Sequence, residues 1–372
     1  MAAIADGYPA GGLIVSTGVA SGSFATLRTT GHIDRINVPV DRLRTLAGLI
    51  AWSRRAVELA RDPAAHFAWC DTMRPAGYAA HWAWRRTRLP YGIMVVGNDV
   101  LTLRAKLERN AFKRRIIRAI LDDAAVFVAI SQWTAARLRE LLTDLDLESA
   151  AARVRVVPLG TDPEHFRADP TSAAAFRRRR GLPDGRWLVT VARLVEYKGI
   201  DSVIRIVADL SVDYADLHYA VVGRGADEQR LRALAAEAGV SDRVHILTDV
   251  SDDELPAAYS MGNVYVGLTR ETDLDVEGFG ISFAEAAACG LPVVATRTGG
   301  IADAVADGET GVLVAQDDHA GTVAALRQLL RYPDGARRVG GAGRERVERY
   351  LNWERVVGEM REIAREKGRL SP

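Results

Sequence analysis

Arg193 and Lys198, five positions apart, are the first side chains in this sequence whose types and spacing could do chemistry. They lie in Val191–Gly199, where an apolar, strand-like run gives way to a helical pattern. An arginine presents a planar fork that binds two phosphate oxygens, whereas a lysine supplies a mobile point charge, so the pair suits a diphosphate. Two surface cations at this spacing are more often only solvated. Their place at the end of a predicted strand favours the binding function.

A second group combines two glutamates with a glycine-bearing loop, in the run EGFGISFAEA that begins at residue 277. The loop opens a predicted helix, and the N–H groups and positive dipole end of a helix N-terminus attract anions. The backbone of Phe279, Gly280 and Ile281 is therefore predicted to hold phosphate oxygens. Glu277 and Glu285 would repel such an anion unless they face sugar hydroxyls, which donate readily to carboxylates. The alternative, a solvated pair of helix-capping glutamates, explains the glycines poorly.

A glycine turn after another predicted strand is a weaker signal. Gly223 and Arg224 stand in the run VVGRG, and glycine lets a ligand approach the backbone closely. A dinucleotide fingerprint requires a third glycine where Glu228 stands, which argues against NAD. Gly223 and Arg224 are candidates for ligand contact, and an ordinary tight turn explains them equally well.

The elements that must position these residues alternate between strand and helix through the second half of the chain. Apolar strand-like runs lie at 187–192, 217–222, 244–248, 264–268 and 293–296. Helical patterns lie between them at 201–210, 227–238, 252–261 and 281–289. Parallel strands need crossover helices, so this alternation predicts a doubly wound sheet with its ligand site at the carboxyl ends of the strands.

The first half of the chain is predicted to form a second domain. Its strand candidates lie at 12–17, 33–39, 66–70, 91–96, 125–130 and 154–158. Residues 159–183 are rich in Pro, Asp and Arg and are predicted to be an irregular interdomain linker. The 372 residues are therefore divided into domains 1–165 and 166–372, and the last helix, 353–367, could pack on either domain.

The composition, 48% hydrophobic and 26% charged, is that of an ordinary soluble protein. No apolar run approaches the roughly 20 residues of a membrane span, and no signal-peptide pattern follows Met1, so we expect a cytoplasmic protein. Cys70 and Cys289 form no CxxC pair and are expected to be buried, inert thiols. No Asp and His cluster has metal-ligand spacing, so we expect no metal cofactor.

Positive charge is concentrated in the first half. Residues 1–165 carry 22 Lys and Arg against 16 Asp and Glu, whereas the remainder carries 27 against 32. Much of this excess lies at 104–118, where the pattern predicts a basic amphipathic helix. Such a helix can rest on the inner, anionic surface of a membrane, or it can be a solvated face packed on a core. The balance of charge is too even for a nucleic-acid partner.

Together the motifs resemble those of glycosyltransferase family 4, retaining enzymes of the GT-B type. The family's RLxxxKG pattern matches residues 193–199, and its E-x7-E pattern matches Glu277 and Glu285 without a gap. The resemblance implies an α/β fold with two Rossmann-like domains that face each other across a cleft. The first domain would serve the acceptor, and the second would bind a nucleoside diphosphate sugar as substrate.

The resemblance also implies a role for each matched residue. Arg193 and Lys198 would bind the donor diphosphate, and Gly278–Ile281 would form the phosphate loop. Glu277 would hold hydroxyls of the donor sugar, and Glu285 would hold the ribose of the nucleotide.

The first half departs from the family pattern in two places. Only eleven residues precede the strand candidate at 12–17, where family members usually have a strand, a glycine loop and a helix, so that first strand is predicted to be absent or supplied differently. Val96 replaces the histidine of a common His-Gly-x-Asp stretch, whereas Asp99 is retained. We expect Asp99 to contact the acceptor or the sugar; the alternative is a helix cap.

The implied reaction transfers a hexose from a nucleoside diphosphate sugar to a hydroxyl of a glycan, lipid or small molecule, with retained configuration and without metal. Fixed cations and helix N–H groups would stabilise the charge that grows on the departing diphosphate. Three alternatives stay open. They are a glycoside hydrolase, which pairs carboxylates but needs no phosphate loop, a sugar-nucleotide epimerase, and a non-catalytic subunit that binds nucleotide sugars.

Overall fold

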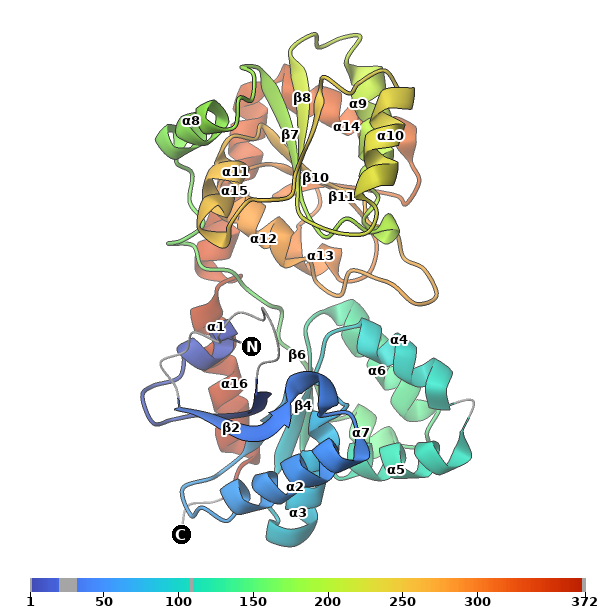
Figure 1. Ribbon diagram of the computed structural model, residues 1–372, viewed down its shortest axis with the longest axis vertical. Helices are drawn as coiled ribbons and strands as arrows, with labels where there is room; N and C mark the ends of the chain where they lie inside the picture. Colours follow the sequence, from blue (N-terminus) through green and yellow to red (C-terminus); the bar gives the residue numbers. More distant parts are fainter. Residues whose placement is uncertain (1, 20–31, 108–109, 370–372) are drawn as a thin grey trace. The chain divides into compact units, whose positions relative to one another are not determined.

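A computed structural model describes residues 2–19, 32–107 and 110–369 of the chain (Figure 1). The chain divides into two compact units: the first unit is residues 1–158 with 353–372, and the second unit is residues 159–352. Each unit contains parallel β-sheet and α-helices. The predicted α/β class is therefore confirmed.

The second unit is built on six parallel strands in the order β12-β11-β10-β7-β8-β9. The strands are β7 (Arg186–Val191), β8 (Leu217–Val222), β9 (Val244–Leu247), β10 (Val264–Gly267), β11 (Val293–Thr296) and β12 (Gly311–Val314). The chain starts in the middle with β7, adds two strands on one side and then returns to add three on the other. The order thus reverses between β7 and β10, and doubly wound sheets bind ligands at the carboxyl ends of such a strand pair.

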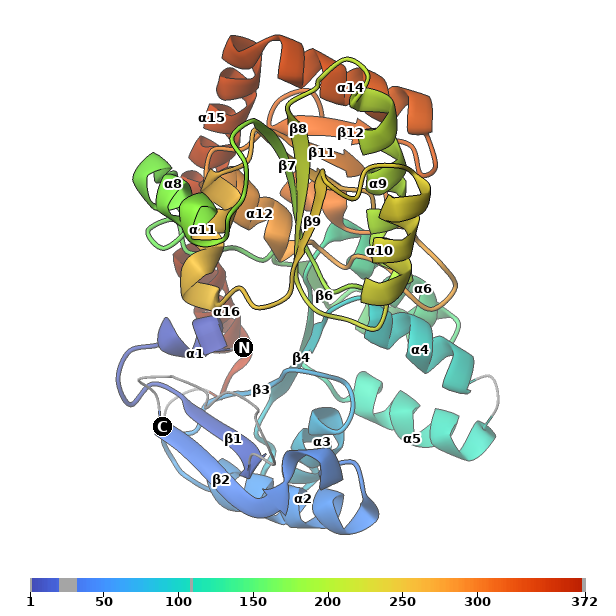
Figure 2. The same cartoon turned by 45° about the horizontal axis from the view of Figure 1, so that its top comes forward.

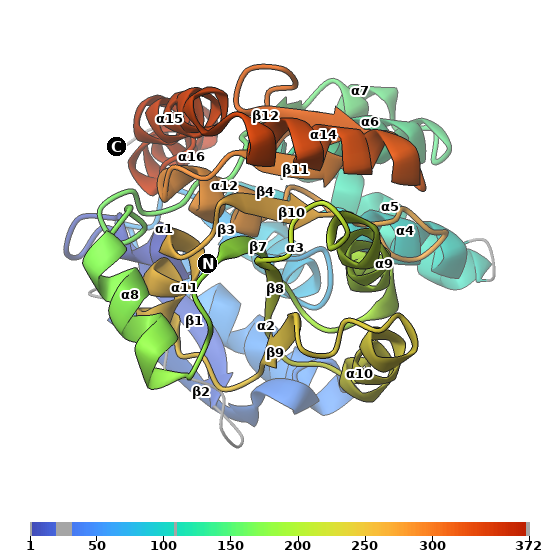
Figure 3. The same ribbon diagram turned by 90° about the horizontal axis from the view of Figure 1, so that it is seen from above.

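Helices cover both faces of this sheet. In Figures 1 and 3, α9 (Ile200–Leu210), α10 (Glu228–Glu237) and α14 (His319–Arg331) lie on one side, whereas α8 (Pro170–Arg179), α11 (Leu255–Ser260), α12 (Ile281–Ala288) and α15 (Pro333–Arg349) lie on the other. Short helices complete the unit: η2 (Glu196–Lys198), η3 (Asp252–Glu254) and α13 (Ile301–Ala304). Because both faces are covered, β8, β10 and β11 are almost wholly buried, which explains their continuous apolar runs.

The first unit has a four-stranded parallel sheet in the order β3-β4-β5-β6 and a separate parallel pair, β1-β2. The strands are β1 (Ile14–Val19), β2 (His32–Pro39), β3 (Ala68–Cys70), β4 (Tyr91–Val95), β5 (Val126–Ala129) and β6 (Val154–Val156). The helices are α1 (Ala2–Asp6), η1 (Val40–Arg42), α2 (Leu46–Ala60), α3 (Ala76–Thr87), α4 (Asn98–Leu107), α5 (Ala111–Asp122), α6 (Gln132–Thr143), α7 (Glu148–Ala151) and α16 (Trp353–Lys367). Figure 2 shows α2 beside the β1-β2 pair and next to α3.

Helix α16 belongs to the first unit although it ends the chain. Its buried residues include Val356, Val357 and Met360, which form one apolar cluster with Ile4 of α1 and Val128 of β5. The division of the chain lies after Pro158 rather than at 165, because the segment that follows packs with the second unit. The Arg344 guanidinium of α15, for instance, donates to the Pro163 carbonyl at 2.7 Å.

Two local predictions are wrong. Residues 159–183 are not irregular throughout, because α8 begins at Pro170, whose ring suits the first helical position, and Asp169 caps it by accepting from the Ser172 amide. The single basic helix expected at 104–118 is two helices. The Asn110 side chain accepts from the Lys113 amide and so starts α5 separately. Arg109, counted in that basic stretch, lies outside the described residues.

Two further expectations concern the thiols and membrane spans. Cys70 and Cys289 are both free and buried, as predicted, and burial raises the pKa of Cys289 to about 12. Over the described residues, no helix is both long enough and apolar enough to cross a membrane.

Gly199 is the residue on which the turn between β7 and α9 depends. Its φ is +65°, and a Cβ placed there would lie 1.8 Å from the carbonyl oxygen of Leu268. Gly239, after α10, has a similar φ of +69° but has open space around it, with nothing within 4 Å of such a Cβ. Both glycines would be strained as alanine, but only Gly199 would also be overpacked. Comparing the two separates the effect of backbone strain from that of close contact.

We expect Gly199→Ala to lower the free energy of unfolding by about 2–5 kcal/mol, since left-handed strain of about 1–2 kcal/mol adds to overpacking of about 1–3 kcal/mol. Gly239→Ala should cost about 1–2 kcal/mol, from the strain alone. Urea unfolding followed by circular dichroism measures both variants. Equal losses would contradict the close approach of Leu268 to this turn.

Candidate functional site

The loops that follow β7, β8, β10 and β11 meet at the carboxyl edge of the second unit's sheet. The Leu194 amide donates to the Arg224 carbonyl at 2.9 Å, which ties the loop after β7 to that after β8. The Gly300 amide donates to the Glu277 carbonyl at 2.8 Å, which ties the loop after β11 to that after β10. The three predicted motifs of this half thus come to one edge, although more than 80 residues separate Arg193 from Glu277.

Arg193 and Lys198 gather around one aromatic ring. The Arg193 guanidinium donates to the Tyr197 hydroxyl at 2.9 Å, and its Cζ lies 6.0 Å from the centroid of that ring. The Lys198 ammonium lies 5.0 Å from the same centroid. The one-turn helix η2 carries Lys198, and the left-handed Gly199 then starts α9. The turn therefore presents two cations at the strand end, as the sequence predicted.

Lys198 and Glu277 form an ion pair between the loops after β7 and β10. Their side chains are only 12% and 16% exposed, so water screens the pair weakly. An ammonium has three N–H donors, so the contact with Glu277 leaves two for other acceptors. A carboxylate oxygen of Glu277 likewise has lone pairs left for hydroxyl donors. The pair can thus bind phosphate on its cationic side and sugar hydroxyls on its anionic side.

The glycine-bearing loop does open a helix, α12, at Ile281. Gly280 has a φ of +88°, and a Cβ there would lie 2.3 Å from the Phe283 ring, so only glycine fits. The Phe283 amide closes back on the Gly280 carbonyl at 3.0 Å. The amides of Ile281 and Ser282 belong to the first helical turn, which has no intrahelical acceptors. This helix start is therefore suited to an anion.

Tyr265 of β10 is a site residue that the sequence did not reveal. Its hydroxyl lies 2.9 Å from Ser282 Oγ in the first turn of α12 and donates to the Val191 carbonyl at the end of β7, at 3.2 Å. One buried phenol therefore holds the start of α12 against the end of β7. The only signal in the sequence is a tyrosine within a buried strand, because such a hydroxyl requires a partner.

Glu285 is held by a second buried tyrosine. The Tyr259 hydroxyl donates to the Glu285 carboxylate at 2.6 Å. Burial raises the pKa of Glu285, although the bond from Tyr259 acts in the opposite direction. A carboxylate kept in a buried position has a cost in stability, which a binding function would explain.

Gly223 and Arg224 stand where the second glycine motif was predicted. The φ of Gly223 is +148°, and a Cβ there would lie 1.9 Å from the Ala192 carbonyl oxygen, so β7 and β8 run close together at this edge. The exposed Arg224 side chain donates to the Thr248 carbonyl after β9. The Gly223 turn is thus a place of close contact between two loops and also part of the candidate edge.

Asp99 belongs to the first unit, in the first turn of α4 after β4. Its Oδ1 accepts from the amides of Gly97 and Val100, both at 3.0 Å, so the cap reading accounts for this atom. Its Oδ2 is buried and has no hydrogen-bond partner within the described part of the chain. Burial raises the pKa of Asp99 to about 6, against the lowering effect of those amides.

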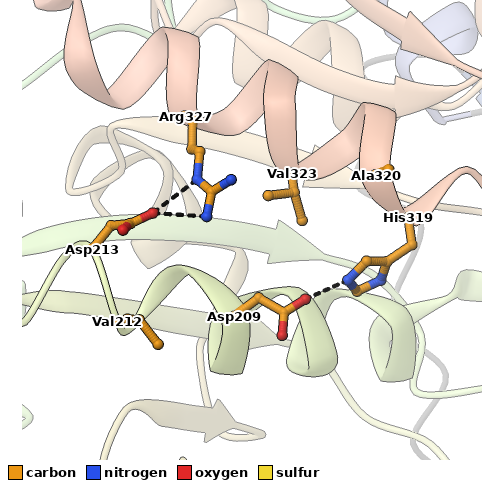
Figure 4. A pocket seen from close by; sticks show the side chains of 7 residues that line it. All are labelled: Asp209, Val212, Asp213, His319, Ala320, Val323 and Arg327. Carbon is orange, nitrogen blue, oxygen red and sulfur yellow. Dashed lines mark hydrogen bonds and ion pairs between the residues drawn. The ribbon is translucent and has the colours of Figure 1, made fainter.

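Neither a metal cluster nor an obvious hollow competes with this edge. Over the described ranges, no three His, Cys, Asp or Glu side chains are grouped as metal ligands would be. A hollow of about 450 Å³ lies between α9 and α14, lined by the side-chain pairs His319–Asp209 and Arg327–Asp213 (Figure 4). It contains none of the predicted site residues, and its ionic side chains are already paired with one another.

Residues 173–346 match the family described as Glycosyl transferases group 1. The chain is 36% identical over 233 residues to a GDP-mannose-dependent alpha-(1-6)-phosphatidylinositol monomannoside mannosyltransferase of Mycolicibacterium smegmatis, covering 62% of this chain and 59% of the relative. It is 34% identical over 288 residues to a D-inositol 3-phosphate glycosyltransferase of Acidothermus cellulolyticus. This match covers 73% of this chain and 61% of that relative. The solved sucrose-phosphate synthase from Thermosynechococcus elongatus is similar with a TM-score of 0.73 at 23% identity, covering 91% of this chain and 83% of that one.

The structural similarity defines the class: this is a GT-B fold, with two Rossmann-like domains, as the motifs predicted. Within the second unit, residues 173–346 carry the similarity to the group 1 glycosyl transferases. The chain spans about 60% of the length of the curated relatives that it matches, 59% in one and 61% in the other.

The raised pKa of Glu285 leads to a prediction about stability. When the folded-state pKa of a carboxyl lies above its unfolded value, ionisation costs folding free energy at high pH, and this cost vanishes below the unfolded pKa. Glu285→Gln keeps an oxygen for Tyr259 and removes the charge. We expect it to stabilise the protein at pH 7.5, on the order of 0.5–2 kcal/mol, and to give no gain near pH 4.

Glu254 is the matched control, because the hydrogen bond from the Ser251 amide lowers the pKa of its carboxyl. Its ionised form stabilises the fold at neutral pH, so Glu254→Gln should destabilise there and converge with the wild type as the pH falls. Thermal melts of both variants between pH 4 and 8 test the signs. A Glu285→Gln protein that melts below the wild type at pH 7.5 would overturn this account of Glu285.

Proposed function

We propose that this protein is a retaining hexosyltransferase that moves a sugar from a nucleoside diphosphate to an acceptor hydroxyl. The observation that carries the proposal is the convergence of the Arg193–Lys198 turn, the Glu277 carboxylate and the start of α12 at the edge where the strand order reverses. A glycoside hydrolase has no use for a cationic turn facing a helix N-terminus. A nucleotide sugar needs both.

Departure of the diphosphate is the step that this edge can accelerate. Negative charge grows on the phosphate oxygens as the glycosidic bond breaks, and positive charge grows on the sugar ring. The guanidinium of Arg193, the remaining N–H donors of Lys198 and the backbone of Gly278–Ile281 would stabilise the former. Glu277 would accept from sugar hydroxyls, and Glu285 from the ribose.

GDP-mannose is the first donor to test, because GDP-mannose stands in the names of several relatives. The relatives' names include phosphatidylinositol mannoside and inositol phosphate acceptors, so we propose an inositol-containing or lipid-linked hydroxyl as the acceptor class. Asp99, whose Oδ2 is unpaired, is proposed as an acceptor-side or sugar-side contact.

The reaction is proposed to need no divalent metal. Metal-dependent transferases neutralise the diphosphate with a cation, and here Arg193, Lys198 and the helix start offer the same charge. Turnover should therefore continue in excess EDTA.

Lys198→Ala tests the proposal. Removal of one electrostatic donor commonly lowers kcat by about 10²–10³-fold, and we expect a loss in this range, measured as transfer of labelled mannose from GDP-mannose in buffer containing EDTA. Lys367→Ala, on α16 and paired with Glu366, is the control and should keep wild-type turnover. Unchanged turnover in Lys198→Ala would refute the assignment.

Binding and product assays separate the alternatives. A donor at 100 times its dissociation constant stabilises the protein by about 2.7 kcal/mol, so a thermal-shift screen of nucleotide sugars identifies the ligand first. Sugar release from a simple glycoside without nucleotide would indicate a hydrolase. A changed sugar without an acceptor would indicate an epimerase, and binding without any turnover would indicate a non-catalytic subunit.

Helix α5 is proposed as a peripheral contact of a cytoplasmic protein with an anionic membrane. Phe112 at its start is 73% exposed, and Lys113 and Arg115 beside it are exposed as well. Arg114 and Arg118, by contrast, donate to the carbonyls of Asp144 and Asp146 and so contribute to the fold. An apolar anchor flanked by cations suits a lipid headgroup layer.

Vesicle co-sedimentation tests this contact. Lys113→Ser and Arg115→Ser should each weaken binding to vesicles containing anionic lipid by about fivefold, since one basic residue near such a surface contributes about 1 kcal/mol. Leu46→Ser, which removes another exposed apolar side chain (76% exposed) on α2, is the control. Equal binding to neutral vesicles, or equal losses in the control, would contradict the proposal.

A further inference from the structure

A buried, bidentate ion pair joins the start of α9 to the loop after β10. Asp201 is 7% exposed, and its two carboxylate oxygens accept from Arg270 Nη1 and Nη2 at 2.9 and 3.0 Å. Burial opposes the ionisation of Asp201, yet hydrogen bonds and charge from Arg270 lower the net pKa of its carboxyl. Such a pair is planar and directional, so it fixes the two segments in one geometry.

Arg270 also holds the turn that carries Lys198. Its backbone amide donates to the Tyr197 carbonyl at 2.6 Å, and its Nη1 donates to the Glu196 carbonyl at 3.1 Å. Its Nη2 donates to Ser202 Oγ at 2.7 Å. Arg270 therefore binds the chain on both sides of Lys198, before it at Glu196 and Tyr197 and after it at Asp201 and Ser202.

The guanidinium of Arg270 has little capacity left for a ligand. A guanidinium has five N–H donors, four of them on Nη1 and Nη2. The acceptors just named, two oxygens of Asp201, the Glu196 carbonyl and Ser202 Oγ, account for those four. The remaining Nε lies 3.7 Å from Asp317. Arg270 is thus a cation close to the Lys198 turn whose hydrogen bonds go to other residues of the protein.

The backbone of the turn has few hydrogen bonds within its own short helix. Helix η2 has only three residues, and its own backbone bonds are those of the Lys198 and Gly199 amides to Val195 and Glu196. Lysine has a long, flexible stem, so the position of the Lys198 ammonium depends on a fixed backbone as well as on its contact with Glu277. A misplacement of about 1 Å at a reacting group can cost about 100-fold in rate.

We infer that Arg270, held by Asp201, is a positioning residue that fixes the Lys198 turn for the donor diphosphate. This inference rests on the proposed function, in that Lys198 must act on the diphosphate. Arg270 acts through Lys198, so removal of Arg270 lowers kcat substantially only while the Lys198 ammonium is present.

A double-mutant cycle tests the inference. Arg270→Ala in the otherwise wild-type protein should lower kcat by about 10- to 100-fold and reduce the preference for GDP over GMP, measured by calorimetry. In the Lys198→Ala background the same change should lower kcat less than about threefold, because residues that act as one unit are not additive. Asp201→Asn, which keeps the shape and loses the charge, should follow the same pattern more weakly.

The control is Arg186→Ala, at the amino end of β7, where Arg186 pairs with Asp216. Any small effect of this variant should be the same in both backgrounds. If Arg270→Ala does not fold, Asp201→Asn completes the cycle alone. Equal factors for Arg270→Ala, or for Asp201→Asn, in the two backgrounds would overturn the positioning role while leaving the proposed function intact. Wild-type turnover in Lys198→Ala would overturn both.

Discussion

The pairing of β7 with β10 is the constraint on which the candidate site depends. Leu188 and Val264 lie opposite one another in this parallel pair, so the loops that leave both strands emerge at the same edge. The polar contacts between these two loops follow from that placement. It brings Lys198 to Glu277, the Tyr265 hydroxyl to Val191 and Ser282, and Arg270 to the turn at Glu196 and Tyr197.

The site combines opposite charges that would be unstable apart. A buried ammonium or carboxylate without a partner is expensive, and Lys198 and Glu277 each reduce this cost for the other. Glu285 shows the residual cost, because burial raises its pKa despite the bond from Tyr259. The proposed function gives a reason for such groups to persist, since cations bind phosphate and carboxylates bind sugar hydroxyls.

Most strands of the second unit's sheet could be predicted from the sequence. A helix start made by a side-chain cap could not. The strands at 217–222 and 293–296 coincide with β8 and β11 because buried parallel strands are continuous apolar runs. The basic stretch at 104–118 looked like one helix because its apolar spacing continues through Asn110. A side-chain cap cannot be read from that spacing, and it is Asn110 that starts a new helix.

The sequence by itself led to the proposed chemistry: the residue types and intervals at 193–199 and 277–285 predicted sites for a diphosphate and a sugar. Each of those patterns lies within one turn or one loop, so its residues are close in sequence and can be recognised without the structure. Only the tertiary structure decided which groups act together. No motif in the sequence marks Arg270, Tyr265 or Tyr259. Their partners, Asp201, Ser282 and Glu285, lie 17 to 69 positions away and become neighbours only when parallel strands close the sheet.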